Sequence, residues 1–177
     1  SHDQIKAIVK AASLAPSAKN RQPWKYLVYE GKAKEELLSA MERGLEREKK
    51  EHCLLPGSAF ALPGAFQTLS IMRKAPVTII VMDPDGRSPY EPVNADERLA
   101  EICDSLSIGA SIQNMLLKAT QLGLGTLWIA NTCFAYNDMV EVIPSKGQLI
   151  GAVAVGYAAE KPYPRPRKNL EEILEYM

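Results

Sequence analysis

The sequence has no excess charge, few cysteines and no long apolar run. Lys plus Arg and Asp plus Glu each number 21 among 177 residues, so the net charge indicates neither a nucleic-acid partner nor an anionic membrane. The three cysteines are odd in number and far apart, which favours free thiols in a reducing compartment. No apolar run approaches the roughly 20 residues of a membrane helix, and no signal peptide is recognisable. These absences predict a soluble, cytoplasmic protein.

Common motifs for metal, nucleophilic and phosphate chemistry are also missing. His52 and Cys53 are adjacent, but no C-x-x-C or H-x-x-x-H spacing accompanies them, so a metal site is disfavoured. There is no G-x-S-x-G, and both histidines lie in charged segments, which argues against a hydrolase triad. The glycines at 123 and 125 lack the lysine of a P-loop and follow a predicted helix. They are therefore interpreted as a helix end leading into a strand.

Length and composition predict one domain spanning residues 1–177. The chain is 46% hydrophobic, and a chain near this length buries about 70% of its unfolded surface. No internal repeat, low-complexity segment or domain boundary is visible. The chain opens with Ser1-His2-Asp3-Gln4, which matches a helix capping box. A first residue that already caps a helix indicates that a segment has been lost upstream.

Apolar periodicity predicts alternating helices and strands. Helices are expected over 3–14, 32–53, 94–122 and 136–142, with a short last helix from Asn169, and strands over 25–30, 75–82, 126–131 and 148–158. Segment 75–82 is apolar throughout, so it should be buried on both faces. Segment 54–70 holds two Pro-Gly pairs and is predicted to be a covering loop or a partner-facing segment. Beyond Ser107 the helix is apolar on nearly every side, which indicates a central helix or one buried against another subunit.

Two segments could bind a ligand. The first, APSAKNRQPW, places backbone amides and short polar side chains between Pro16 and Pro23. Such a stiff loop can satisfy the polar edge of a ligand, or it can be an ordinary helix-to-strand connection. The second is the tail Arg165-Pro166-Arg167-Lys168, which is either an anion site or a solvated basic end.

Three successive segments together resemble the FMN-dependent nitroreductase family. They are APSAKNRQPW, SIGASIQNMLLKATQLGLGTLWIA and GAVAVGYAAEKPYPRPRKNLEEI, and the resemblance runs from Ala11 to about Ile173. It implies an α+β protein with the three-layer α/β/α nitroreductase-like fold, in which helices flank a mixed sheet. It also implies a homodimer with FMN bound at the subunit interface, and NADH or NADPH as co-substrate.

The resemblance also implies which residues contact the flavin. Loop residues that would line it are Ser17, Ala18, Asn20 and Gln22. Strand residues that would lie along its ring, with a backbone N–H directed at N5, are Leu127, Trp128, Ile129 and Ala130. The phosphate would be held by Arg167, with Arg165 or Lys168 assisting. No catalytic side chain is assigned, because the flavin carries the chemistry.

The chain departs from the family pattern in three places. Ser107 stands where many members have Asp, and Ala130 where many have Gly. The Arg-rich opening segment is absent, so either the chain is incomplete or it binds flavin weakly. The implied function is NAD(P)H-dependent reduction of nitroaromatics, quinones or similar acceptors by a ping-pong mechanism. Two alternatives stay open: a dehalogenase or flavin-fragmenting enzyme of the same fold, and a non-catalytic flavin-binding protein.

Overall fold

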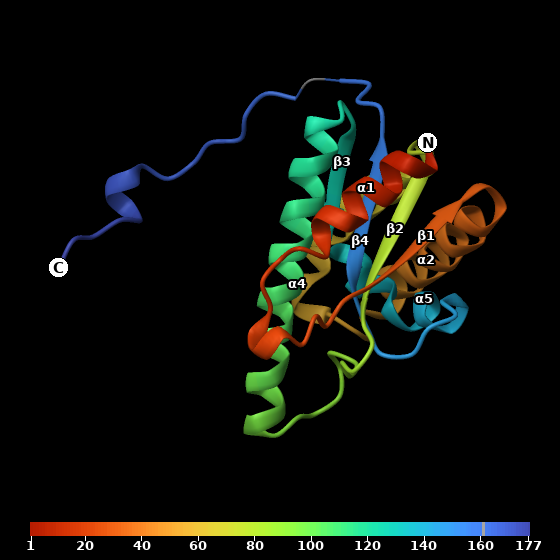
Figure 1. The fold of residues 1–177 in the computed structure, drawn as a ribbon. Coiled ribbons are helices and arrows are strands. Elements are labelled where there is room, and N and C mark those ends of the chain that lie inside the picture. Colours follow the sequence, from red (N-terminus) through yellow and green to blue (C-terminus); the bar gives the residue numbers. More distant parts are fainter. Residues whose placement is uncertain (161) are drawn as a thin grey trace.

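The computed structural model describes residues 1–160 and 162–177, which build a four-stranded sheet with helices on both faces (Figure 1). The strands are β1 (Lys25–Glu30), β2 (Val77–Asp83), β3 (Gly125–Ile129) and β4 (Gln148–Gly156), in the order β1-β2-β4-β3. All four lie where the sequence predicts strands. Strands β1 and β3 therefore form the two edges of the sheet.

Each pair of neighbouring strands is antiparallel, where the sequence analysis expects a mixed sheet. The direction of the strands explains the difference. Strands β2 and β3 run the same way, because one long helix returns the chain between them. Strand β4 then inserts between these two and runs opposite to both. Chain order alone does not reveal such an insertion.

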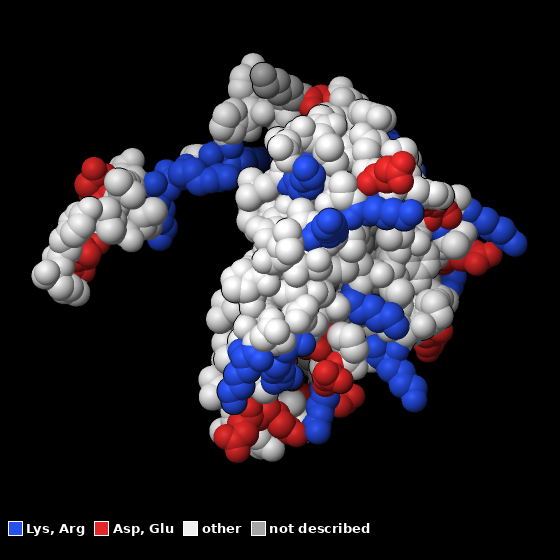
Figure 2. All heavy atoms as spheres, in the orientation of Figure 1, with Lys and Arg blue, Asp and Glu red and all other residues white. Residues whose placement is uncertain are grey.

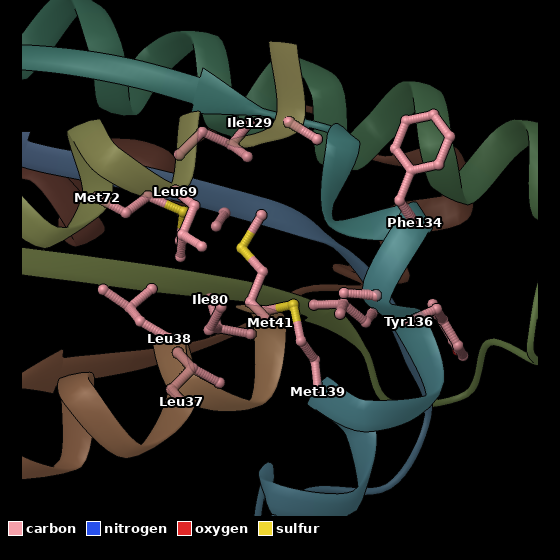
Figure 3. Packing of buried hydrophobic residues seen from close by; sticks show 14 of the residues in the cluster. Leu37, Leu38, Met41, Leu69, Met72, Ile80, Ile129, Phe134, Tyr136 and Met139 are labelled. Atoms are coloured by element: carbon pink, nitrogen blue, oxygen red, sulfur yellow. The ribbon is translucent and has the colours of Figure 1, made fainter. Parts of the chain in front are cut away.

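The helices form two layers, as the three-layer prediction requires. One face of the sheet is covered by α1 (His2–Ala12) and α4 (Ala95–Gln121). The other is covered by α2 (Gly31–Glu51), α3 (Leu62–Lys74) and α5 (Tyr136–Val142). Figure 3 shows how side chains from α2, α3 and α5 meet over the sheet.

Strand β2 connects the two cores. All seven of its residues are buried. Val77, Ile79 and Val81 pack with α1 and α4, whereas Ile80 and Met82 pack with the opposite layer. Successive side chains of a strand point to opposite faces, so an apolar run of this kind serves two cores at once. The prediction of a strand buried on both faces is confirmed.

Segment 54–70 is helical from Pro56 onward, so the prediction of a covering loop there is wrong. A 3-10 helix, η2 (Pro56–Ala61), leads directly into α3. Pro56 and Pro63 each occupy the first turn of their helix. Proline is well suited to that position, because its fixed φ fits a helix and its missing N–H has no partner there anyway. The two Pro-Gly pairs thus mark helix starts and not turns.

Helix α4 starts and ends as predicted but is not covered on every side. Asn94 and Glu97 form its capping box, and Gly123 follows its end at a φ of 72°. Its buried side includes Ile108, Ile112 and Met115. A second side of the same helix is exposed and apolar, and its large residues are Leu99, Ile102, Leu106 and Leu117. We call this set the α4 stripe.

The chain ends in a segment that leaves the body of the molecule. After β4 it runs out on the side of α4, and its described residues carry only the short helix η4 (Leu170–Glu172), smaller than the predicted last helix (Figure 1). The residues described beyond 156 are all exposed, including the large side chains of Tyr163, Ile173 and Tyr176. Among the residues described, no helix is both long and apolar enough to cross a membrane.

Candidate functional site

The loop between α1 and β1 has an unusual backbone conformation. Lys19, Asn20 and Gln22 have φ values of 52°, 54° and 51°, and none of the three is glycine. L-residues populate this left-handed region sparsely, although asparagine tolerates it better than most. Strained backbone of this kind persists only where surrounding contacts enforce it, and it concentrates at binding sites. The predicted ligand-binding loop is therefore a strained segment, which we call the strained loop (residues 17–22).

Hydrogen bonds within the strained loop set the direction of its side chains. Ser17 Oγ accepts from the backbone N–H of Gln22 at 3.0 Å, so this hydroxyl faces its own loop. Asn20 Oδ1 accepts from Gln22 Nε2 at 3.3 Å. Both amide side chains belong to exposed residues. Asn20 and Gln22 are thus available to a ligand, whereas Ser17 serves the loop itself.

Helix α4 holds the strained loop at two points. The backbone N–H of Ala18 donates to Ser107 Oγ at 3.2 Å, and the Arg21 guanidinium pairs with Asp104 Oδ2 at 2.8 Å. The hydroxyl of Ser107 in turn donates to the carbonyl of Cys103 at 2.7 Å. Sequence reasoning missed Arg21 and Asp104. The available signal was a pair of small polar residues, Asp104 and Ser107, one helical turn apart in a largely apolar helix.

Strand β3 offers its backbone more than its side chains. Ile129 is buried in the core between the sheet and the layer of α2, α3 and α5. Trp128 is half-exposed on the opposite face, close to Gly109 of α4. Leu127 packs against the same core as Ile129, and Ala130 is exposed. Because β3 pairs only with β4 within the described part of the chain, alternate backbone groups point away from the sheet edge. The predicted backbone contact has donors available, but the side chain of Ile129 cannot take part.

The predicted phosphate residues lie apart from the strained loop in a single chain. Arg165, Arg167 and Lys168 are exposed on the terminal segment, which Figure 2 shows as a basic stretch outside the body. The Arg167 guanidinium donates to the carbonyls of Arg165 and Pro166 at 3.0 and 3.2 Å. These cations can reach a ligand at the strained loop only if the segment moves or if the ligand is shared with a second copy.

Comparison with known proteins identifies the family. The model of the Nitroreductase family matches residues 1–157. The chain belongs to the Nitroreductase family. A Streptococcus pyogenes protein provisionally named as an NAD(P)H nitroreductase is 25% identical over 183 residues, covering 98% of this chain and 88% of that protein. An Archaeoglobus fulgidus protein provisionally named as an NADH dehydrogenase/NAD(P)H nitroreductase is 28% identical over 130 residues, or 73% of this chain. The match spans 55% of the Archaeoglobus protein.

Solved structures show the same nitroreductase fold. The FMN-dependent nitroreductase NfnB from Mycobacterium smegmatis, in complex with NADPH, has a TM-score of 0.76 at 18% identity, covering 100% of this chain and 89% of that one. A BluB-like flavoprotein from Clostridium difficile has a TM-score of 0.73 at 21% identity, with coverages of 100% and 90%. A nitroreductase with bound FMN from Desulfitobacterium hafniense has 0.71 at 21%, with coverages of 100% and 87%.

An acidic cleft borders the strained loop of this nitroreductase-family chain. It has a volume of about 180 Å³ and lies between the turn after β2 and the start of α4. Its lining includes five carboxylate residues and two arginines: Asp83, Asp85, Glu97, Glu101, Asp104, Arg21 and Arg87. Such a surplus of negative charge disfavours a phosphate, and none of the predicted flavin contacts lines the cleft. Among the described residues, no group of three or more His, Cys, Asp or Glu could hold a metal ion.

Proposed function

We propose that this protein is an FMN-dependent oxidoreductase that uses NADH or NADPH to reduce nitroaromatics, quinones or similar acceptors. The observation that carries the proposal is the strained loop, which has three non-glycine residues at positive φ in the segment that resembles the family's flavin-binding motif. A strained backbone held by outside contacts is the expected form of a preorganised binding loop. The match of the family model over residues 1–157 supports the same reading.

Residues of the strained loop, of strand β3 and of the terminal segment fit FMN in three respects. Exposed amides of Asn20 and Gln22 can bond the polar edge of the ring system, because each offers both a donor and an acceptor. The free edge of β3 can supply a backbone N–H, and the tail guanidiniums suit a phosphate. When bound, FMN would supply hydride acceptance and electron delivery, while the protein orients the reactants. One reactant would leave before the next binds the same face, as a ping-pong mechanism requires.

The proposed enzyme works as a homodimer. In one chain the α4 stripe is exposed, with Leu106 and Leu117 at 70% and 60% of full accessibility. The terminal segment leaves the body on this side (Figure 1). It carries exposed apolar side chains of its own. A contiguous apolar surface of this kind normally marks an interface. A second copy would cover the α4 stripe and give the basic tail a surface to lie on.

We also propose a cytoplasmic location. Cys53, Cys103 and Cys133 are free cysteines, and the compartment that maintains free thiols is the reducing cytoplasm. The location can be tested by fractionating the source cells with an antibody against the protein.

The decisive experiment adds FMN to the purified protein and follows flavin absorbance under anaerobic conditions. NADH or NADPH should bleach the bound flavin, and a later addition of nitroaromatic or quinone should restore the colour. Double-reciprocal plots of initial rate against NADH or NADPH concentration, measured at several acceptor concentrations, should be parallel. Colour without bleaching would show a non-catalytic binder, and loss of flavin from the product mixture would show a fragmenting enzyme. Either result would overturn the proposed reaction.

A further inference from the structure

The two points at which α4 holds the strained loop share one spacing. Ala18 and Arg21 are three residues apart in the loop, and their partners Ser107 and Asp104 are three residues apart in α4. Residues at this separation lie on the same side of a helix, one turn apart. One turn of the loop therefore lies along one turn of the helix, with a hydrogen bond at one end and an ion pair at the other.

Both helix residues are almost inaccessible to solvent. Asp104 is 4% exposed and Ser107 is 6% exposed. Water cannot easily replace the partners of a buried hydroxyl or a buried carboxylate, and leaving either group without a partner is unfavourable. Contacts made from such positions restrain the loop more strongly than contacts made by mobile surface side chains. The helix acts as the fixed side of the interaction, and the loop as the side that is held.

The charge of Asp104 makes Arg21 its necessary partner. Asp104 Oδ1 is buried without a hydrogen-bond partner among the described residues. Asp83 lies close by: burial and then the Asp104 charge raise the pKa of Asp83, against backbone hydrogen bonds from Asp85 and Gly86 that lower it. A buried carboxylate beside another carboxylate requires a cation, and Arg21 supplies it at 2.8 Å. The buried carboxylate of Asp104 thus holds the guanidinium of Arg21, although the Arg21 side chain stays 41% exposed.

We propose that Asp104 and Ser107 are positioning residues of the strained loop, holding Lys19, Asn20 and Gln22 in the left-handed conformation before any flavin binds. The ligand's identity rests on the proposed function, whereas the restraint is a property of the free protein. Arg21 then acts through the loop backbone and does not bind the phosphate. Preorganisation of this kind raises affinity, because the loop does not need to be ordered during binding.

The first test uses ligand-free protein, so it does not depend on flavin binding. Asp104→Asn keeps the side-chain shape but removes the charge that pairs with Arg21, and Ser107→Ala removes the acceptor for the Ala18 N–H. Hydrogen–deuterium exchange measured by NMR should be faster at the amides of Ala18 and Gln22 in both variants. The matched control is Glu101→Gln, because Glu101 lines the same cleft but pairs with Arg98 at 2.8 Å. Unchanged exchange in Asp104→Asn would overturn the proposal.

The second test compares FMN with riboflavin, which lacks the phosphate. Asp104→Asn should lower the affinity for both ligands by the same factor, about tenfold. This is the size expected when binding has to order the backbone of about one additional residue. Glu101→Gln should leave both affinities unchanged. A loss confined to FMN would overturn the proposal, since it would show that this region contacts the phosphate.

A double variant separates the restraint from general stability. Arg21→Gln alone leaves Asp104 buried without its cation. The thermal unfolding midpoint of this single variant should therefore fall further below that of the wild type than the midpoint of the double variant Arg21→Gln/Asp104→Asn. Flavin affinity should not recover in the double variant, because the loop is still free. Recovery of stability and affinity together would show that the ion pair only supports the fold, which would overturn the positioning role.

Discussion

Asn20 is the residue whose side chain is best placed to meet a flavin. It is exposed on the strained loop, and its amide is already oriented by Gln22 Nε2. Asn20→Leu should weaken FMN by about 1–3 kcal/mol, because a buried polar group of the ligand would lose its partner. The dissociation constant can be measured by quenching of flavin fluorescence.

Two further variants isolate the amide from the backbone. Leucine is strained at a φ of 54°, whereas glycine adopts this φ without steric cost. Asn20→Gly therefore removes the amide without straining the backbone. Asn20→Leu and Asn20→Gly should both lose affinity for FMN. If only Asn20→Leu loses affinity, the effect comes from the backbone, and the Asn20 side chain makes no contact with the flavin. Asn137→Leu makes the same change at an exposed site on α5, in the other helix layer, and should leave affinity unaltered.

Glu48 is a buried carboxylate that shapes the entry into η2. Its two oxygens accept from the backbone N–H groups of Cys53, Leu54 and Leu55 at 3.1, 2.9 and 2.8 Å, and from the Cys53 thiol. Glu48→Gln should lower the free energy of unfolding at pH 7 by about 1.5–3 kcal/mol, the range for hydrogen bonds to a charged group. Urea denaturation measures this. Glu36→Gln, on an exposed part of the same helix, should cost no more than about 0.5 kcal/mol.

The pH dependence of this effect has a definite sign. Burial acts to raise the pKa of Glu48, but the hydrogen bonds from Leu55, Leu54 and Cys53 outweigh it, and the net pKa lies below the usual 4.5. A lowered folded-state pKa contributes stability above the unfolded pKa, and that contribution disappears as the pH falls through the folded value. The difference between wild type and Glu48→Gln should therefore shrink below about pH 4.5. A constant difference down to pH 3 would contradict this account.

At the scale of elements, close packing of α2 against the α5 side depends on Gly44. A Cβ at this position would lie 2.6 Å from Ala135 Cβ and 2.7 Å from the Ala135 Cα. Gly44→Ala should destabilise the protein by about 1–3 kcal/mol, because backbone must shift to admit the methyl group. Gly64→Ala, in the first turn of α3 with nothing within 4 Å, should instead stabilise it by up to about 1 kcal/mol. Thermal unfolding of the two variants should move in opposite directions.

Local sequence signals predicted the elements because most are determined locally. The capping pair Ser1–Gln4 and the apolar run of β2 each act over a few residues, and both are present as expected. Segment 54–70 was assigned wrongly because a Pro-Gly pair has two local meanings, a turn or a helix start. Only packing of Leu62, Ala65 and Leu69 into the core decides between them.

The candidate site was predictable only in part, because its contacts join distant segments. The motif around Asn20 marks the strained loop. Nothing in it reveals that Arg21 meets Asp104, which lies 83 positions further along the chain. Likewise, the apolar character of α4 is visible in the sequence. Which side is core and which is free depends on α1 and the sheet, so Met115 is fully buried while Leu117 is exposed.

For the whole molecule, the α4 stripe provides a direct test of the proposed dimer. Leu106→Lys and Leu117→Lys each place a charge on the exposed side of α4 without entering the core, and should convert the protein to a soluble monomer. Val142→Lys makes the same kind of change on the exposed side of α5, in the opposite layer, and should leave the dimer intact. Sedimentation velocity at micromolar concentration distinguishes the two states. A wild-type monomer under these conditions would contradict the proposal.

A mixing experiment tests whether the tail of one subunit completes the site of the other. In one chain the tail cations lie away from the strained loop, so we expect Arg167 to serve the partner's flavin. Arg167→Ala and Asn20→Leu should each weaken FMN, the former by about 1.5–3 kcal/mol and with no loss for riboflavin. When the two variants are unfolded together and refolded as mixed dimers, one of the two sites receives an unaltered loop and an unaltered tail. A mixed dimer should therefore bind one FMN with wild-type affinity. If each chain supplied both groups to its own site, both sites would stay impaired, and titration of separately tagged mixed dimers would reveal no tight site.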